Sequence, residues 1–280
     1  MIYLLLLAIL PVILLCLFIY KKDVNREPKG LLAKMFIFGF LSAIPIVIIE
    51  LLLGIFFSTK GETNFLILFI NVFISVALIE EGFKWLVVKI FGYNNKEFDE
   101  VYDVIVYSVF ASLGFACIEN ILYVLGGGIG TAIVRAILSV PGHMCFGVIM
   151  GYFLSQSKVN QNNGNYSIYT RNIIFSILFP TLAHTIYDAL LFYAVETASI
   201  LTILIFLVFD IVMVVLCFIT VGKTSKIQKN LNKSIDTGVI ALDEDGILTY
   251  QKKKEINYCP VCGHYVKEYN YCPKCGFKIK

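Results

Sequence analysis

Charged residues are scarce in this chain of 280 residues. Only 15% of the side chains are charged, against roughly 25% in an average soluble protein, whereas 58% are hydrophobic and the mean hydropathy is +0.80. The charges are also unevenly placed, because residues 223–280 hold 17 of the 43. The rest of the chain is too apolar to dissolve. This scarcity excludes a soluble enzyme, a disordered chain and a disulfide scaffold.

Long apolar runs take the place of charge. A helix needs about 20 apolar residues to cross roughly 30 Å of hydrocarbon, and the runs that reach this length are 1–20, 31–57, 64–91, 104–126, 131–155, 172–195 and 198–222. The first run lacks the basic start and the small-residue cleavage site of a signal peptide, so we expect it to be retained. We predict an all-α polytopic membrane protein with about seven transmembrane helices over 1–222, a polar linker over 223–257 and a small domain over 258–280.

The positions of the basic residues predict the orientation. Alternate loops and the tail carry them: Lys21, Lys22, Arg26 and Lys29, then Lys96, then Lys158 and Arg171, then Lys223, Lys226, Lys229 and Lys233. The other loops hold only Lys60. Cytoplasmic loops carry an excess of Lys and Arg, so we expect a protein of the cell membrane with its N-terminus outside and its tail in the cytosol. The net charge of +3 is explained by this topology, and we expect no nucleic-acid partner.

The tail contains two short cysteine motifs of the form CPxCG. Their four thiols are Cys259, Cys262, Cys272 and Cys275. Thiols stay reduced in the cytosol, and two C-x2-C pairs fit a closed tetrahedral zinc site, with Gly263 and Gly276 permitting the turns that direct N–H groups at sulfur. The motif resembles the zinc ribbons attached to many bacterial membrane proteins, and we expect it to dock a cytosolic partner. A thioredoxin-like redox site is the alternative, but it lacks a βαβ context. Ahead of the ribbon, an Asp-Gly between apolar runs at 239–250 favours a hairpin.

Ionisable residues inside apolar runs are costly and mark functional sites. Glu80, Glu81 and Lys84 share one run, and Glu80 and Lys84 lie one helical turn apart on the same face. A buried ion pair with Lys84 that fixes helix packing would explain the presence of one glutamate but not of the second. Two adjacent carboxylates beside one lysine have separated proton affinities, which is how one acid and one base arise at the same pH.

The later runs add two histidines and two more acids. Glu119 precedes Asn120, which can donate a hydrogen bond, and Gly114 nearby permits close helix approach. His143 follows Pro141-Gly142, which can break a helix. A further pair, His184 and Asp188, is spaced i, i+4, so the carboxylate can orient the ring or share a cation with it. Glu50, Arg135 and Asp210 fall into no motif; we expect Asp210 to be neutral or paired with Arg135.

The motifs EEGFK (80–84), FACIEN (115–120), PGH (141–143) and HTIYD (184–188) resemble, in order, the EExxK, FxxxEN, central histidine and HxxxD motifs of PrsW-type intramembrane proteases. These proteases are related to CAAX prenyl proteases and bacteriocin-processing enzymes. The resemblance implies site-1-type cleavage of a single-pass membrane protein, typically an anti-sigma factor. It also implies that Glu80 and Glu81 form the catalytic pair, that Glu119 supports them and that His143, His184 and Asp188 complete the site, with Lys84 and Asn120 supporting it. The CAAX branch has histidine at the position of Glu119, which disfavours a prenylated substrate.

Two questions about the mechanism stay open at this stage. Glu80 or Glu81 is the expected base for the attacking water. The two histidines, His143 and His184, either ligate a catalytic zinc that polarises the carbonyl or donate hydrogen bonds to the oxyanion, a role for which Asn120 is another candidate. If the helices are straight, Glu80 lies nearer the cytosol and Glu119 nearer the outside, so the fourth run starts later, near Val106, or a helix is broken.

Two other functions would also concentrate ionisable residues in the membrane. A transporter predicts an internal repeat with paired broken helices, and the sequence contains neither. A noncatalytic scaffold or sensor that works through its zinc ribbon predicts that the intramembrane carboxylates can be neutralised without effect.

Overall fold

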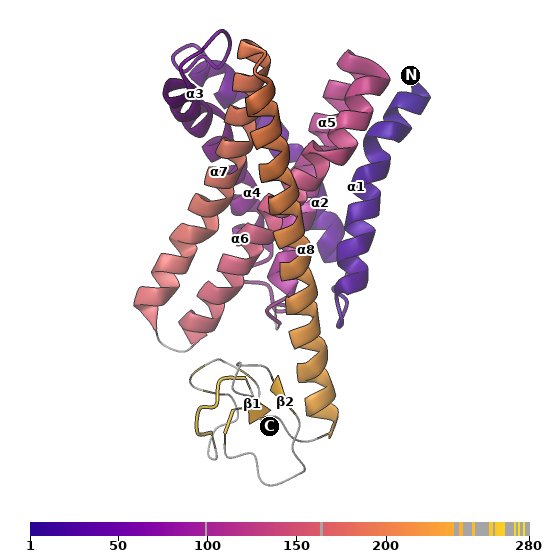
Figure 1. Cartoon of the computed structure of the whole chain (residues 1–280). Helices are drawn as coiled ribbons and strands as arrows, with labels where there is room; N and C mark the ends of the chain where they lie inside the picture. Colours follow the sequence, from indigo (N-terminus) through magenta and orange to yellow (C-terminus); the bar gives the residue numbers. More distant parts are fainter. Residues whose placement is uncertain are drawn as a thin grey trace.

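The computed structural model describes residues 1–98, 100–162 and 165–237, and in the tail residues 241–242, 248–249, 258–259, 261–266, 272, 274 and 277. The described residues form long helices and two short strands (Figure 1). In chain order the elements are α1 (Ile2–Lys22), α2 (Lys29–Leu53), α3 (Phe65–Val72), the π-helix η1 (Phe73–Ala77), α4 (Leu78–Phe91), α5 (Asp103–Ile137), α6 (Ser139–Asn162), α7 (Tyr166–Thr197), α8 (Ile200–Thr237), β1 (Ala241–Leu242) and β2 (Leu248–Thr249). The predicted all-α membrane architecture is confirmed.

Six helical stretches of the described chain are long and apolar enough to cross a membrane. One of them, Asp103–Gln161, has 59 residues, or about 88 Å of helix, which is far more than one crossing needs. It turns back at Gly128, whose φ of 75° and ψ of −157° are not helical. Arg135 Nε therefore donates a 2.9 Å hydrogen bond to Asn120 Oδ1, although a straight helix would hold these residues about 22 Å apart. The stretch supplies two antiparallel arms, so the described residues form seven arms of membrane length.

Helix α5 forms the centre of the bundle. All but one of residues 103–117 are buried, and α1, α2 and α6 pack around them. The contact with α2 depends on Gly114, because a Cβ atom at this position would lie 2.1 Å from the carbonyl oxygen of Phe36. The close approach expected at Gly114 is therefore present, and it sets the distance between the two helices.

The arm that carries Glu80 and Glu81 is not a regular α-helix. Its π-helical turn η1 precedes α4, and Ser75 Oγ there donates a 2.7 Å hydrogen bond to the carbonyl oxygen of Asn71. Such π-turns insert one extra residue and occur frequently at functional sites. Helix α5 starts at Asp103 and not near Val106, so the later start is wrong; the irregularities are the π-turn η1, within a continuous arm, and the break at Gly128.

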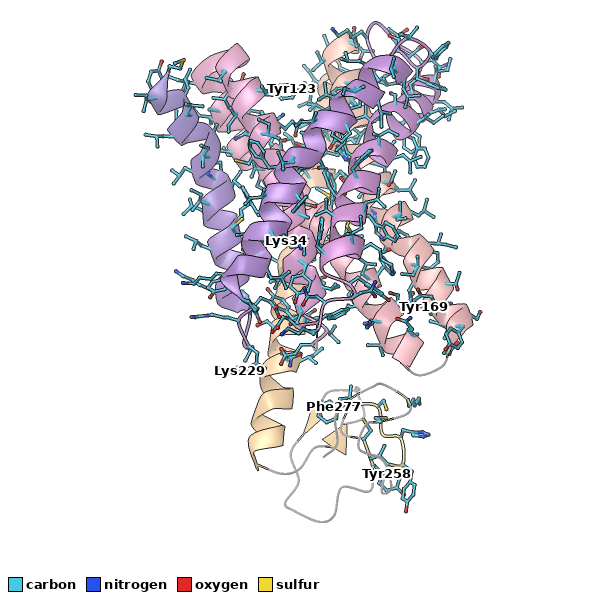
Figure 2. All side chains as sticks on the ribbon, turned by 180° about the vertical axis from the view of Figure 1, so that it is seen from behind. Lys34, Tyr123, Tyr169, Lys229, Tyr258 and Phe277 are labelled. Atoms are coloured by element: carbon cyan, nitrogen blue, oxygen red, sulfur yellow. The ribbon has the colours of Figure 1, made fainter. Side chains whose placement is uncertain are left out.

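The connections between the arms alternate between the two ends of the bundle. The N-terminus and the 54–64 connection lie at one end, while residues 23–28, residues 92–98 and the C-terminal end of α8, where the tail begins, lie at the other (Figure 1). Lys34 and Lys229 lie toward the tail end, and Tyr123 lies toward the opposite end (Figure 2). The basic loops thus share one end of the molecule, which is the arrangement that the expected orientation requires.

Helix α8 continues to Thr237, well beyond residue 222, where we expected a linker to begin. The polar residues that follow, such as Lys226 and Gln228, are good helix formers, and no proline interrupts them. Strands β1 and β2 then pair antiparallel with Leu242 opposite Leu248. This pairing agrees with the expected hairpin, whose turn at 243–247 lies outside the described residues.

Candidate active site

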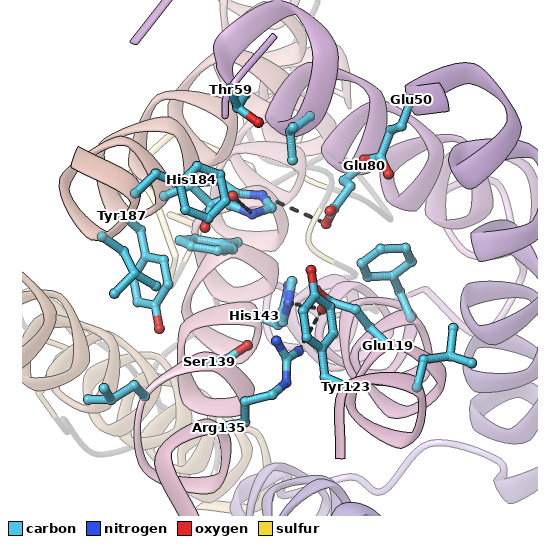
Figure 3. Close-up of a pocket in the computed structure, with 18 of the residues that line it drawn as sticks. Glu50, Thr59, Glu80, Glu119, Tyr123, Arg135, Ser139, His143, His184 and Tyr187 are labelled. Atoms are coloured by element: carbon cyan, nitrogen blue, oxygen red, sulfur yellow. Dashed lines mark hydrogen bonds and ion pairs between the residues drawn. The ribbon is translucent and has the colours of Figure 1, made fainter. Parts of the chain in front are cut away.

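Both intramembrane histidines and all the intramembrane acids except Asp210 lie in or directly behind the wall of one cavity of about 670 Å³. Helices α2, η1, α4, α5, α6 and α7 all contribute to its wall (Figure 3). Of the six predicted catalytic residues, five line it: Glu80, Glu119, His143, His184 and Asp188. Glu81 lies behind this wall and is fully buried. The cavity extends to Thr59, Lys60 and Glu196, at the end of the bundle opposite the tail.

Lys84 joins the two glutamates to the first histidine. Its Nζ atom lies 2.9 Å from Glu80 Oε2, 2.7 Å from Glu81 Oε1 and 3.3 Å from His143 Nδ1. An ammonium group has three N–H donors and no acceptor, so these three contacts use all of its donors. The expected i, i+4 pair of Glu80 and Lys84 is present, and the same ammonium neutralises the second glutamate as well.

The contacts of His143 define which nitrogen carries its proton. Because Lys84 can only donate, Nδ1 must accept, and the ring hydrogen lies on Nε2. That nitrogen donates to Glu119 Oε2 over 2.8 Å. Arg135 Nη2 lies 2.9 Å from the same carboxylate oxygen. His143 is thus a neutral imidazole held between a cation and a carboxylate, and neither nitrogen points to an unused position.

His184 has a carboxylate at each ring nitrogen. Glu81 Oε1 lies 3.1 Å from Nδ1, and Asp188 Oδ2 lies 3.3 Å from Nε2. Phe146 stacks on the ring with centroids 4.6 Å apart, which fixes the plane of the imidazole. The predicted pairing of His184 with Asp188 is therefore present. The structure also places a second acid, Glu81 of the α4 motif, at the other ring nitrogen.

The sequence motifs did not include two residues of this cavity, and they suggested a different role for Asn120, which lies outside its lining. Arg135 and Glu50 line the cavity, although neither belongs to a motif. Arg135 pairs with Glu119, so of the two alternatives given for Asp210, the pairing with Arg135 is not the one observed. Asn120 Nδ2 donates to the carbonyl oxygen of Ala8 over 2.6 Å, so this amide ties α1 to α5; Asn120 is fully buried and is not among the residues that line the cavity. The fold-back at Gly128 lies in the break predicted between the runs 104–126 and 131–155, but the contact of Arg135 with Glu119 across it was not predicted.

The described part of the tail brings three of the four predicted zinc ligands together. Ligand atoms of Cys259, Cys262 and Cys272 all lie within 4.8 Å of one another, while Cys275 lies outside the described residues. Backbone N–H groups point at two of the sulfurs: Val261 donates to Cys259 Sγ over 3.4 Å and Lys274 donates to Cys272 Sγ over 3.3 Å. These are the knuckle contacts that the glycine-containing turns predict, and Gly263 has the positive φ of 66° that its turn needs.

The fold and the cavity together define an intramembrane hydrolase, because they enclose paired carboxylates and oriented histidines inside a helical bundle. Residues 27–218 match the PrsW family intramembrane metalloprotease family. The chain belongs to this family. It is a multi-pass membrane protein and an intramembrane protease.

Curated relatives support the assignment. The chain is 41% identical over 184 residues to the Protease PrsW of Oceanobacillus iheyensis, covering 66% of this chain and 80% of that protein. It is 42% identical over 183 residues to the Protease PrsW of Geobacillus kaustophilus, with 64% and 75% covered. It is 36% identical over 185 residues to the Protease PrsW of Bacillus subtilis, with 66% and 80% covered. No solved structure matches the chain.

The family description implies a metal, and the donor set of the cavity fits one. One ligand atom from each of Glu80, Glu81 and His184 lies within 4.8 Å of the other two. Glu81 Oε2 is buried and has no hydrogen-bond partner among the described residues, so this oxygen has the free lone pairs that a metal ligand needs. His143, which we considered as a zinc ligand beside His184, is not part of this group.

Proposed function

We propose that this chain hydrolyses a peptide bond of a single-pass membrane protein near the outer face of the membrane, in the manner of a site-1 protease. The observation that carries the proposal is the cavity, which joins Glu80 and His184 in its interior to Thr59 and Glu196 at the end away from the tail. Because the basic loops lie at the tail end, the positive-inside rule puts the mouth of the cavity outside and the tail in the cytosol.

Glu80 is the general base of the proposed reaction. It lines the cavity, whereas Glu81 lies behind it, so only Glu80 can contact a water molecule placed there. Glu80 takes a proton from the attacking water as the C–O bond forms, and it returns a proton to the leaving amide nitrogen as the C–N bond breaks. Glu81 positions Lys84 and His184 through the contacts of 2.7 Å and 3.1 Å.

Arg135 is the donor that we assign to the carbonyl oxygen of the scissile bond. Its hydrogen bond to Asn120 uses one of the five N–H donors of a guanidinium group, Nη2 lies 2.9 Å from Glu119 as an ion pair without hydrogen-bond geometry, and the residue lines the cavity. A fixed cation in a water-poor site stabilises the developing oxyanion strongly. Glu119 and His143 hold Arg135 in place and are its positioning residues.

A metal ion, if bound, would be held by Glu80, Glu81 and His184, and it would supply Lewis-acid polarisation of the carbonyl. Asp188 would then orient the His184 ring from its other nitrogen, as carboxylates commonly do for metal-bound histidines. The tail carries a second, structural zinc on Cys259, Cys262, Cys272 and Cys275, and the ribbon docks a cytosolic partner.

The substrate class follows from the resemblance to PrsW-type proteases, which implies an anti-sigma factor with one transmembrane helix. Mass spectrometry of terminal peptides tests it, in membranes from cells that express either the wild type or Glu80→Gln. We expect new termini in the outer half or outer juxtamembrane segment of a single-pass protein, in wild-type cells only. Termini mapping to the cytosolic side would contradict the proposed side of cleavage, and identical termini in both cell lines would contradict proteolysis at this site.

A further inference from the structure

A second hollow lies on the outside of the bundle, remote from the catalytic cavity. It has a volume of about 390 Å³ and runs between α1 and α2. We name it the α1–α2 groove; it is lined by Ile13, Cys16, Leu17, Tyr20, Lys29, Leu32, Ala33, Phe36, Ile37 and Phe110. From Lys29 to Ile37 it follows about 12 Å of helix. Apart from Lys29 and the Tyr20 hydroxyl the wall of the groove is apolar. Its apolar part fits a hydrocarbon chain, whereas the end that carries Lys29 and the Tyr20 hydroxyl, which we call its mouth, suits a polar group.

The mouth of the groove is positively charged. Lys29 is exposed and belongs to its lining, and the Arg26 guanidinium lies 5.4 Å from the ring centroid of Tyr20, which lines the groove from α1. No described carboxylate lies within 4.0 Å of either cation. Lys34 takes no part, because its ammonium lies 4.3 Å from the ring centroid of Phe91 on α4.

The acids of the same loop point away from this mouth. Asp23 and Glu27 are only 3% and 5% exposed, and the Tyr107 hydroxyl donates to Glu27 Oε2 over 2.6 Å. The short connection between α1 and α2 therefore separates its charges, with carboxylates inside and cations at the rim. An apolar groove with a cationic rim at the basic end of a membrane bundle has the chemistry that recognises an anionic headgroup and its acyl chain.

We propose that the α1–α2 groove binds one acyl chain of an anionic phospholipid, whose phosphate is held by Arg26 and Lys29. The lipid lies between α1 and α2, with Phe110 of α5 also contributing to the groove wall. It is a structural ligand of the bundle, distinct from the protein substrate of the catalytic cavity. Binding raises the free energy of unfolding by an amount that grows with the logarithm of the ratio of lipid concentration to Kd.

The test is thermal unfolding of the purified full chain in detergent, titrated with phosphatidylglycerol or with phosphatidylcholine of the same acyl chains. We expect phosphatidylglycerol to raise the midpoint and phosphatidylcholine or inorganic phosphate to leave it unchanged. The variant Arg26→Gln/Lys29→Gln should lose about 30-fold in apparent affinity, because each basic residue near an anionic headgroup contributes about fivefold. Lys96→Gln/Arg171→Gln removes the same charge from the same end and should behave as wild type.

Ala33→Trp fills the apolar part of the groove without changing charge, and it should also abolish the phosphatidylglycerol response. The proposal is overturned if both lipids raise the midpoint equally, or if inorganic phosphate alone reproduces the response. It is equally overturned if the Arg26→Gln/Lys29→Gln and Ala33→Trp variants keep the wild-type response. Proteolysis by Glu80 can fail or succeed independently of each of these results.

Discussion

At the scale of single residues, the site is organised by shared ions rather than by separate pairs. Lys84 serves Glu80, Glu81 and His143 at once, and Arg135 serves Glu119 and Asn120. Two buried carboxylates can lie side by side only because one ammonium lies against both of them. This arrangement leaves one face of Glu80 toward the cavity while Glu81 is held behind it.

The first residue-scale prediction concerns Lys84. Lys84→Met keeps most of the volume but leaves Glu80 and Glu81 without their cation, and removing one partner of a buried ion pair costs about 3–5 kcal/mol. We expect a large loss of folded protein, measured as the unfolding midpoint in detergent. The double variant Lys84→Met/Glu81→Gln removes the repulsion and should recover part of the stability but none of the activity. If Lys84→Met alone unfolds at the wild-type midpoint, the shared ion pair does not stabilise the bundle.

The second residue-scale prediction concerns Arg135. Arg135→Lys keeps the charge but loses the fork that contacts Asn120 and Glu119 together, so we expect cleavage to fall by about 10²-fold or more, the usual effect of losing an oxyanion donor. The matched control is Asp210→Asn, because Asp210 is a buried acid outside the cavity and should retain most activity. Glu50 is unsuitable as a control, since it lines the cavity. Wild-type cleavage by Arg135→Lys would remove Arg135 from the mechanism.

At the scale of elements, the site depends on two interruptions of regular helix. The π-turn η1 lies directly before α4, which carries the glutamates, and the reversal at Gly128 returns the chain so that Arg135 and then His143 face Glu119. The cysteine cluster of the tail is a separate element: its described members Cys259, Cys262 and Cys272 are not among the residues that line the cavity. The membrane part and the ribbon should therefore respond separately to mutation.

The element-scale prediction concerns that ribbon. A short domain of this kind folds on its metal, so the full chain should contain one zinc more per molecule than the variant Cys259→Ser/Cys262→Ser. Metal analysis of the two purified proteins measures the difference directly. Cys145→Ser/Cys217→Ser is the matched control, since both thiols lie in membrane arms. Equal zinc in the wild type and the ribbon variant would contradict the four-thiolate site.

At the scale of the whole molecule, the alternation of loops predicts a fixed orientation. Lys60 lies at the cavity end, and Lys96 lies at the tail end with a side chain that is 90% exposed. In whole cells, a membrane-impermeant thiol reagent should label Lys60→Cys and spare Lys96→Cys until the membrane is opened. The reverse labelling pattern would mean that the protein has the opposite orientation in the membrane, with the proposed cleavage on the cytosolic side.

Much of this architecture could be predicted from the sequence because its signals are local. Apolar runs gave the arms, and i, i+4 spacing gave the pairs Glu80–Lys84 and His184–Asp188. Contacts across helices could not be obtained in this way, because they depend on the register between distant segments. Arg135 reaches Glu119 through the reversal at Gly128, which lies in the glycine-rich break predicted between the runs 104–126 and 131–155, but the contact itself depends on how the two arms align. Asn120 likewise bonds to Ala8, which is 112 residues away.

The measurement that tests the central claim most directly is cleavage of the membrane substrate in cells that express equal membrane levels of wild type, Glu80→Gln, Glu81→Gln or Asp210→Asn. Glutamine keeps the volume and hydrogen bonding of glutamate but cannot accept the proton of water. We expect cleavage to fall by at least about 10²-fold in Glu80→Gln, the usual contribution of a positioned base, and to stay near wild type in Asp210→Asn. Wild-type cleavage by both Glu80→Gln and Glu81→Gln would contradict catalysis at this cavity.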